Sequence, residues 1–202
     1  MPGADRRPRR AAFLDRDGVI NVDHGYTHRI EDFVFVAGVL EGAARLVRLG
    51  LQLVVVTNQA GIGRGLYGEE EFAHLTRWMT ARFAEAGAPI AAVYHCPHHP
   101  TMAIGALRRA CDCRKPAPGM LLQARDDLAL DMAGSLMFGD KCDDMRAALA
   151  AGVGTRVLLG KDGLALPADP CADGAVTLRQ HSLATALQDP ALLERVAGVA
   201  DR

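Results

Sequence analysis

Short apolar runs alternate with helix-like patterns along most of this chain, and this alternation limits the folds that it can adopt. In Leu51–Val56 five of six residues are apolar, and Glu69–Ala86 repeats apolar residues at helical spacing before Gly87. Strands that are apolar on both faces and separated by helices form parallel sheets covered on both sides. The sequence therefore predicts an α/β fold with a doubly wound, mainly parallel, Rossmann-like sheet. Strands are expected at 11–14, 51–56, 90–94, 135–138 and 156–159, and helices at 39–49, 69–86, 118–128, 143–151 and from about 181 onward.

Length and charge limit the organisation and the partners of the chain. We expect one domain over residues 11–202, preceded by a disordered basic tail at 1–10, because 202 residues suffice for one substantial core. The formal net charge of −1 argues against a general attraction to nucleic acid or to anionic membranes. The apolar runs are shorter than a membrane span, and none follows the basic tail as in a secretory signal. We therefore expect a cytoplasmic protein without membrane or nucleic-acid partners, with no large cap domain and hence monomeric.

Carboxylates follow two of the expected strands. Asp15 and Asp17 come directly after the first strand, and Asp140 follows the fourth. Ligands of such sheets bind beyond the carboxyl ends of the strands, and buried carboxylates are costly unless they are paired or bind a metal. A solvated turn is the alternative, whereas an EF-hand is excluded because Ile20 and Tyr26 occupy its glycine and glutamate positions. The pattern favours a Mg²⁺ site.

The same edge carries the groups that phosphoryl transfer requires. Asp15 can act as a nucleophile that forms an aspartyl-phosphate, and Asp17 can protonate the leaving oxygen and then activate water. Lys115 and Lys141 can neutralise charge on the phosphoryl oxygens, and Thr57, after the second strand, can donate a hydrogen bond.

A glycine pattern supports a competing function. Residues 63–68 match G-x-G-x-x-G, and Glu85 lies near the distance expected for a ribose-binding acid, as in an NAD-binding oxidoreductase. However, the glycines follow their strand by several residues, and Glu85 falls within a helical pattern instead of ending a strand. A mobile surface loop with Arg64 pointing outward is favoured, and the absence of Gly-Lys-Ser/Thr excludes a P-loop.

Two close pairs of metal-binding residues, Cys96 with His98 and Cys111 with Cys113, predict a structural Zn²⁺ site in the irregular insertion before the helix expected at 118–128. Four soft or borderline ligands suit a closed tetrahedral zinc site, with reduced thiols and a zinc-dependent interaction module as alternatives. His95 and His99 are neighbouring candidates for the histidine ligand. Zinc would fix the loop that carries Arg114 and Lys115. Cys142 and Cys171 receive no role beyond that of small buried hydrophobes. The four favoured ligands are Cys96, His98, Cys111 and Cys113.

Four motifs together resemble those of haloacid-dehalogenase-type phosphatases. They are Asp15-Arg16-Asp17-Gly18, Thr57-Asn58, Lys115, and Gly139-Asp140-Lys141 followed by Asp143-Asp144. The resemblance implies that Asp15 is the nucleophile and Asp17 the general acid and base, with Thr57 and Lys115 stabilising the phosphoryl group. It also implies that Mg²⁺ is bound by Asp140, Asp15 and the backbone carbonyl of Asp17. Either Asp143 or Asp144 would support Lys115 or the metal.

The zinc loop narrows the resemblance to the histidinol-phosphatase group of that superfamily, over about Ala11 to Val157. Within this group the segment Asp23–Tyr26 favours the sugar bisphosphate phosphatases, which remove the C7 phosphate of a heptose 1,7-bisphosphate for surface-glycan synthesis. Histidinol-phosphate phosphatase is the alternative. Arg114 would grip the phosphate that is not cleaved, and Ala60 offers only its backbone. The implied substrate contacts are Asp23, His24, Gly25, Tyr26, Thr57, Asn58, Gln59, Ala60, Arg114, Lys115 and Lys141.

Overall fold

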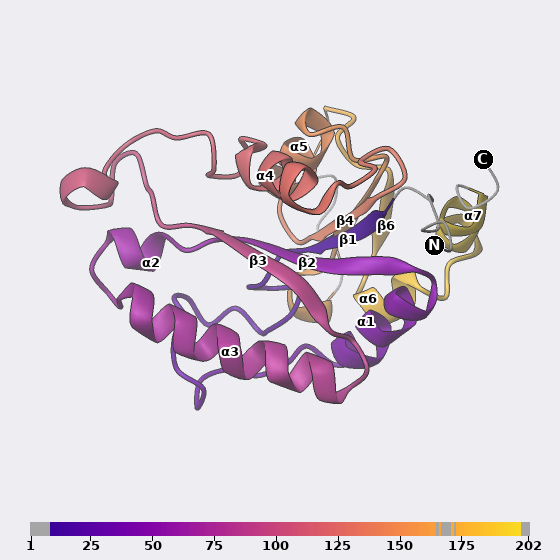
Figure 1. Ribbon diagram of the computed structural model, residues 1–202, viewed down its shortest axis with the longest axis horizontal. Coiled ribbons are helices and arrows are strands. Elements are labelled where there is room, and N and C mark those ends of the chain that lie inside the picture. Colours follow the sequence, from indigo (N-terminus) through magenta and orange to yellow (C-terminus); the bar gives the residue numbers. More distant parts are fainter. Residues whose placement is uncertain (1–8, 165, 167–170, 172, 199–202) are drawn as a thin grey trace, which may run out of the picture.

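The computed structural model describes residues 9–164, 166, 171 and 173–198, and its centre is a parallel six-stranded sheet (Figure 1). The strand order is β3-β2-β1-β4-β5-β6, and every neighbouring pair is parallel. The chain winds outward in one direction from β1 to β3 and in the other from β4 to β6. The carboxyl edge between β1 and β4 is therefore the switch point at which such folds bind ligands. The strands are β1 Arg10–Leu14, β2 Leu51–Asn58, β3 Ile90–Cys96, β4 Leu136–Gly139, β5 Thr155–Leu159 and β6 Leu178–Gln180.

Helices cover both faces of the sheet, as the sequence predicts. In Figure 1, α4 and α5 lie above the sheet, while α1, α3 and α6 lie below it. The helices are α1 Val39–Arg48, α2 Ala60–Gly63, α3 Glu69–Glu85, α4 Gly119–Leu128, α5 Cys142–Ala150, α6 Leu183–Ala186 and α7 Pro190–Gly198, with short 3₁₀ turns η1 at Gly105–Leu107 and η2 at Lys161–Gly163.

The alternation of side chains along the strands divides the apolar core in two. In β1, Ala12 and Leu14 pack with α1, α3 and α6, whereas Ala11 and Phe13 pack with α4 and α5. All four side chains are fully buried. Because both faces of each central strand are covered, these strands have the continuous apolar runs seen in the sequence.

Most predicted elements are confirmed, with small shifts at their ends. β2 and β3 each run two residues further than expected, because parallel pairing continues through Thr57 and Asn58. At the end of the predicted tail at 1–10, Arg9 bridges to Leu130 and Arg10 begins β1. Its first eight residues lie outside the described part, and the single domain over 11–202 stays a prediction. The elements β6, α2, η1 and η2 were not predicted.

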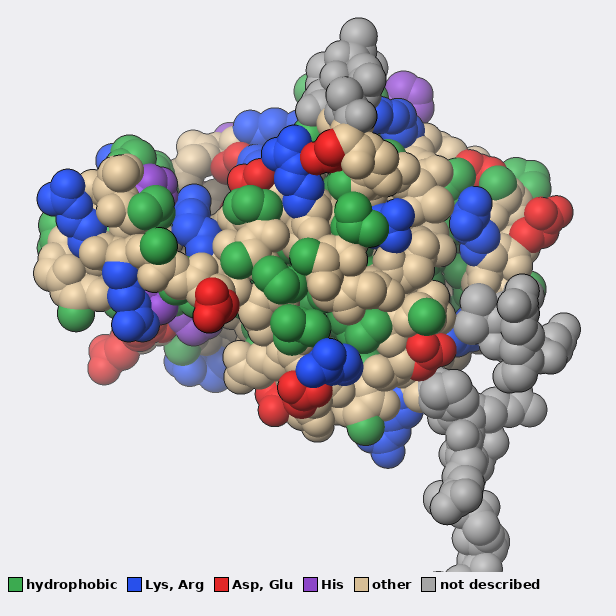
Figure 2. Space-filling model, turned by 90° about the horizontal axis from the view of Figure 1, so that it is seen from above, with side chains coloured by type: hydrophobic (Ala, Val, Ile, Leu, Met, Phe, Trp, Pro, Cys, Tyr) green, Lys and Arg blue, Asp and Glu red, His purple; other side chains and the backbone are tan. Residues whose placement is uncertain are grey.

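The connection from β3 to α4 projects from one end of the molecule and carries the predicted zinc ligands (Figure 1). Figure 2, which views the α4–α5 side, shows Lys and Arg side chains on this projecting lobe. The lobe is a loop with one 3₁₀ turn and not a cap domain. Among the described residues, no helix is both long enough and apolar enough to cross a membrane.

Candidate active site

A cavity of about 390 Å³ opens at the carboxyl edge of the sheet. Most of the predicted catalytic and substrate-binding residues line it: Asp15, Asp17, Asp23, Gly25, Tyr26, Thr57, Asn58, Gln59, Ala60, Arg114, Lys115 and Lys141. Tyr67 and His99 also line the cavity and were not predicted. His24 is exposed and lines a neighbouring hollow that shares Gly25 and Tyr26 with the cavity, so its contact with the substrate stays a prediction.

Lys115 lies at the floor of the cavity between two buried carboxylates. Its Nζ donates to Asp15 Oδ1 at 2.8 Å and to the carbonyl of Val56 at 2.8 Å, and it lies 2.6 Å from Asp144 Oδ1. The side chains of Lys115 and Asp144 are each 2% exposed and that of Asp15 is 6% exposed. Of the two acids that the sequence left open, Asp144 therefore supports Lys115, whereas Asp143 is half exposed and faces Arg146.

Burial and charge compete at this cluster. Burial alone would lower the pKa of Lys115, but the carboxylates of Asp144 and Asp15 outweigh it and raise that pKa above its usual value. Burial likewise raises the pKa of the Asp15 carboxyl, against the opposing charge of Lys115. Lys115 therefore stays a cation, and it offsets much of the cost of placing Asp15 inside the protein.

Asp140 has the features of a cation ligand. Both of its carboxylate oxygens are buried and lack a hydrogen-bond partner among the described residues, which would be costly without a cation. Burial, and then the charge of Asp15, raises the pKa of Asp140 to about 7. A Cβ on Gly18 would lie 2.4 Å from Asp140 Oδ2, and Gly18 has a φ of +94°, so this close approach requires glycine.

Carboxylate oxygens of Asp15, Asp140 and Asp144 lie within 4.8 Å of one another. Hard oxygen ligands in such a group fit Mg²⁺, which keeps several waters and takes few protein carboxylates. The side chain of Asp17 does not belong to this group, which agrees with the predicted use of its backbone carbonyl but does not test it.

Five hydrogen bonds fix the Asp17 carboxylate at the cavity wall, one of them from Arg16 Nη2 to Oδ2 at 3.0 Å. Its Oδ1 accepts from Arg16 Nε at 3.2 Å, from Arg16 Nη2 at 3.0 Å and from Asn21 Nδ2 at 3.1 Å. Its Oδ2 accepts from Gln59 Nε2 at 3.0 Å. Arg16 is 2% exposed and also donates to the carbonyl of Thr27 at 2.8 Å. Arg16 thus connects the catalytic loop, residues 15–23 after β1, to the backbone at Thr27. Its position between two acids in the sequence did not indicate this role.

Side chains at the end of β2 and just beyond it support the site. Gln59 Nε2 also donates to Thr57 Oγ1 at 2.8 Å, and Tyr67 donates its O–H to Gln59 Oε1 at 2.5 Å. Asn58 holds the backbone of Lys115 at both ends: its Nδ2 donates to the Lys115 carbonyl at 3.0 Å, and its Oδ1 accepts from the Lys115 N–H at 3.1 Å. Hydrogen bonds therefore link Thr57, Gln59 and Tyr67 in one chain, while Asn58 positions the backbone of Lys115.

The glycine pattern at 63–68 is a turn that packs against the site. α2 ends at Gly63, and a Cβ on Gly61 would lie 2.1 Å from the ring of Tyr67. Arg64 lies at the surface and has a partner there: its guanidinium stacks 4.9 Å from the centre of the exposed Tyr26 ring and donates to the tyrosine oxygen. The glycines permit close packing here. A dinucleotide site requires its glycines directly after a strand, and these do not follow one directly.

The four predicted zinc ligands converge in the projecting lobe. The sulfurs of Cys96, Cys111 and Cys113 lie 2.9 to 3.5 Å apart, and Nδ1 of His98 lies 3.3 Å from Cys113 Sγ. Zn–S bonds of about 2.3 Å in a tetrahedron would place sulfurs about 3.8 Å apart, so a modest expansion suffices. The candidate His95 instead contacts Glu69. The other, His99, accepts hydrogen bonds from the N–H groups of residues 101 and 102 through Nδ1.

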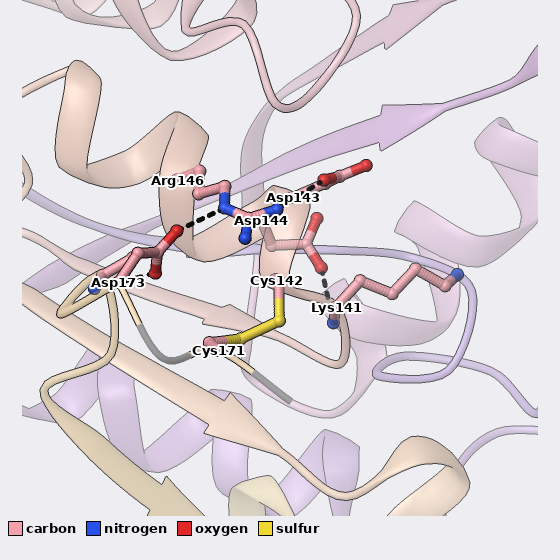
Figure 3. The surroundings of a disulfide bond; sticks show 8 residues. Lys141, Cys142, Asp143, Asp144, Arg146, Cys171 and Asp173 are labelled. Carbon is pink, nitrogen blue, oxygen red and sulfur yellow. Dashed lines mark hydrogen bonds and ion pairs between the residues drawn. A yellow bond between two sulfur atoms is a disulfide. The ribbon is translucent and has the colours of Figure 1, made fainter. Parts of the chain in front are cut away.

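Cys142 and Cys171 form a disulfide with a Cα–Cα distance of 5.6 Å, which corrects the prediction that they have no partner role. Figure 3 shows the bond at the start of α5, beside Lys141 and Asp144. The two cysteines are 29 residues apart, and no spacing rule relates them. The bond ties the helix that carries Asp144 to the segment before β6.

Known proteins of one family are similar to this chain. A family model described as HAD-hydrolase-like matches residues 112–171. A Vibrio cholerae protein named D-glycero-beta-D-manno-heptose-1,7-bisphosphate 7-phosphatase is 58% identical over 149 residues, which are 74% of this chain and 80% of that protein. The chain belongs to this family of HAD-like phosphatases. The Escherichia coli K12 member of the same name is 51% identical over 176 residues, covering 86% of this chain and 90% of that protein.

A solved structure extends the likeness to the whole fold. The D,D-heptose 1,7-bisphosphate phosphatase of B. bronchiseptica, complexed with magnesium and phosphate, superposes with a TM-score of 0.73 at 30% identity, covering 89% of this chain and 97% of that one. Membership of the heptose bisphosphate phosphatase family supports the sugar phosphatase prediction over histidinol phosphate and over NAD.

Proposed function

We propose that this protein removes the C7 phosphate of D-glycero-β-D-manno-heptose 1,7-bisphosphate, giving heptose 1-phosphate and inorganic phosphate. The observation that carries the proposal is the buried Lys115 between Asp15 and Asp144. Beside it lies Asp140, whose carboxylate oxygens have no hydrogen-bond partner among the described residues. These groups suit phosphoryl transfer, and the relatives named above carry the β anomer in their names.

The chemistry has two steps on one nucleophile. Asp15 attacks the C7 phosphorus while Asp17 gives its proton to the leaving C7 oxygen, so that the P–O bond to the sugar breaks. Asp17 then takes a proton from water, and the resulting hydroxide attacks the phosphorus of the Asp15 aspartyl-phosphate and releases phosphate. Lys115 and the Thr57 hydroxyl hydrogen-bond the phosphoryl oxygens, on which charge accumulates in both steps.

Asp15, Asp140 and the backbone carbonyl of Asp17 would hold Mg²⁺. When bound, the ion supplies positive charge that brings the anionic phosphate and the Asp15 carboxylate together. The unpartnered Asp140 oxygens and the glycine packed against them are the observations that support this assignment.

Cationic side chains of the cavity would bind the phosphate that remains. Arg114 and Lys141 both line the cavity, and Arg114 donates to the carbonyl of His98 at 3.2 Å. A guanidinium can meet a phosphate through two parallel hydrogen bonds. Asp23 and the turn around Gly25 and Tyr26 would accept and donate hydrogen bonds to sugar hydroxyls. A Zn²⁺ ion in the lobe would have a structural role, since a Cys₃His set leaves no open coordination position.

The product would be consumed in the synthesis of nucleotide-activated heptose for a surface glycan such as the lipopolysaccharide core or an S-layer. We propose a cytoplasmic monomer, because the formal charge of −1 gives no general attraction to anionic membranes and the lobe beside the site is a loop and not a large cap domain.

Phosphate release from four substrates tests the function: both anomers of heptose 1,7-bisphosphate, histidinol phosphate and p-nitrophenyl phosphate. The β anomer should have the highest kcat/KM. A higher value for histidinol phosphate would overturn the proposal. Asp15→Asn should abolish turnover but keep substrate binding, whereas Asp126→Asn, an exposed carboxyl on α4, is the matched control. Substantial turnover by Asp15→Asn would contradict the aspartyl-phosphate mechanism.

A further inference from the structure

Two of the three lysines of this chain line the cavity, and the third, Lys161, contacts Asp23 at its wall. The sequence has 23 Lys and Arg residues, of which only three are lysine. Lys115 contacts Asp15, and Lys141 and Lys161 both approach Asp23. Lys161 has no part in the function proposed above. It begins η2 directly beyond β5, at the same carboxyl edge as the catalytic residues.

Asp162, the next residue in η2, joins two points of the catalytic loop. Its Oδ1 accepts from the Asp23 N–H at 2.8 Å, and its own N–H donates to the carbonyl of Gly18 at 2.9 Å. Asp162 has a φ of +56°, a left-handed conformation that aspartate tolerates better than most residues. Because Gly18 packs against Asp140, Asp162 links the sugar-binding turn to the proposed cation ligand.

Two lysines share one carboxylate at this corner of the cavity. Asp23 Oδ2 lies 3.3 Å from Lys161 Nζ and 3.7 Å from Lys141 Nζ, while its Oδ1 accepts from the Gly25 N–H at 3.0 Å. Burial would raise the pKa of Asp23, but the hydrogen bond from Gly25 and the charges of Lys141 and Lys161 outweigh it and lower that pKa. Asp23 is thus a fixed anion shared by two lysines, and Lys141 Nζ also lies 3.8 Å from Asp140 Oδ2, the proposed cation ligand.

We propose that Lys161 and Asp162 are positioning residues that set the specificity of this site for a phosphorylated sugar with a second phosphate. Asp162 fixes the turn that carries Asp23. Lys161 neutralises the Asp23 carboxylate, which leaves the charge of Lys141 for the uncleaved phosphate. Without Lys161, Asp23 would pair with Lys141 alone and repel the incoming anion. The inference rests on the proposed function, because it assigns Lys141 to the remaining phosphate of that substrate.

Lys161→Met keeps the length of the side chain and removes its charge. For heptose 1,7-bisphosphate we expect KM to rise about 3–10-fold at low salt with kcat within about two-fold, and the rise to shrink in 0.5 M salt. For p-nitrophenyl phosphate, which lacks a second phosphate, kcat/KM should not change. Lys161→Arg should restore the wild-type KM. Arg82→Met removes one exposed positive charge from α3 and is the control for net charge.

Asp162 provides an independent second comparison. Asp162→Asn keeps an acceptor for the Asp23 N–H and tolerates the left-handed backbone, so its KM should remain near wild type. Asp162→Ala loses the acceptor and should raise KM for the bisphosphate, while thermal melting reports whether the variant is folded. Equal losses on both substrates, or a Lys161→Met variant with unchanged KM, would overturn the inference. The proposed function is tested separately, by which substrate the wild-type enzyme prefers. The inference is tested by the ratio of each variant's KM for the bisphosphate to the wild-type KM.

Discussion

Replacing Asp144 with Asn tests the central charge cluster of the site. Lys115 Nζ has three partners, at 2.6 Å from Asp144 Oδ1 and at 2.8 Å from both Asp15 Oδ1 and the Val56 carbonyl. The second Asp144 oxygen accepts from the Lys141 N–H at 3.0 Å. An asparagine has one oxygen for these two donors. Either the Lys115 ammonium group or the Lys141 backbone N–H therefore loses its acceptor and faces an NH₂ group instead.

The size of the loss follows from these contacts. A hydrogen bond to a charged group contributes about 1.5–3 kcal/mol, and a buried donor without an acceptor costs about 1–3 kcal/mol. Removing a partner from a buried ion pair costs about 3–5 kcal/mol when the remaining charge is left alone. Lys115 still has Asp15, so we expect the free energy of unfolding to fall by about 2–4 kcal/mol. For a chain of this length the melting temperature should then fall by roughly 5–12 °C.

Thermal melting and urea unfolding measure this loss directly. Asp143→Asn is the matched control, because Asp143 is the preceding residue of α5, is half exposed and lies 3.7 Å from Arg146; its effect on unfolding should stay within about 0.5 kcal/mol. Turnover by Asp144→Asn should fall at least about ten-fold, since Lys115 would bind more closely to the nucleophile and less to the phosphate. Equal destabilisation by the two variants, or less than about 1 kcal/mol for Asp144→Asn, would refute this account of the cluster.

Three further changes test the metal sites and the disulfide. Gly18→Ala should weaken activation by Mg²⁺ in a titration and destabilise the fold more than Gly50→Ala, because both glycines have positive φ but only Gly18 faces Asp140 at 2.4 Å; identical effects would contradict the close approach. Purified protein should contain about one zinc per chain, and chelation followed by Mg²⁺ alone should not restore turnover, whereas Mg²⁺ with Zn²⁺ should. The double variant Cys142→Ser/Cys171→Ser should lose about 3.6 kcal/mol of stability, the loop-closure value for 29 residues. Reductant should lower the melting temperature of the wild type and not of that variant.

The fold was largely predictable because its central strands are buried on both faces. Such strands show as unbroken apolar runs, and five of the six strands of the described sheet were predicted in this way. The sixth, β6, has three residues, all partly or fully exposed, so it lacks this signal. Its position depends on pairing with β5, a contact between segments distant in the sequence.

The site was predictable where chemistry follows a strand directly, as at Asp15 and Asp140. The choice between Asp143 and Asp144 was not, because neighbours on a helix point about 100° apart and only the packing of α5 decides which one faces Lys115. Arg16 was missed because a buried guanidinium is identified by its tertiary partners. The composition does set Lys161 apart, because only three of the 23 Lys and Arg residues are lysines.

The position of Lys115 depends on parts of the chain that no single motif contains. Asn58 at the end of β2 holds its backbone, Asp144 on α5 holds its ammonium group, and Cys113 of the zinc cluster precedes it by two residues. Gly119, which begins α4, donates its N–H to the carbonyl of Asp112 at 2.7 Å and closes this turn. Because these supports come from a strand, a helix and the loop of the proposed zinc site, loss of zinc should act on turnover through the position of Lys115. Chelation should therefore lower kcat for every phosphate ester, whereas loss of Lys161 should affect only those with a second phosphate.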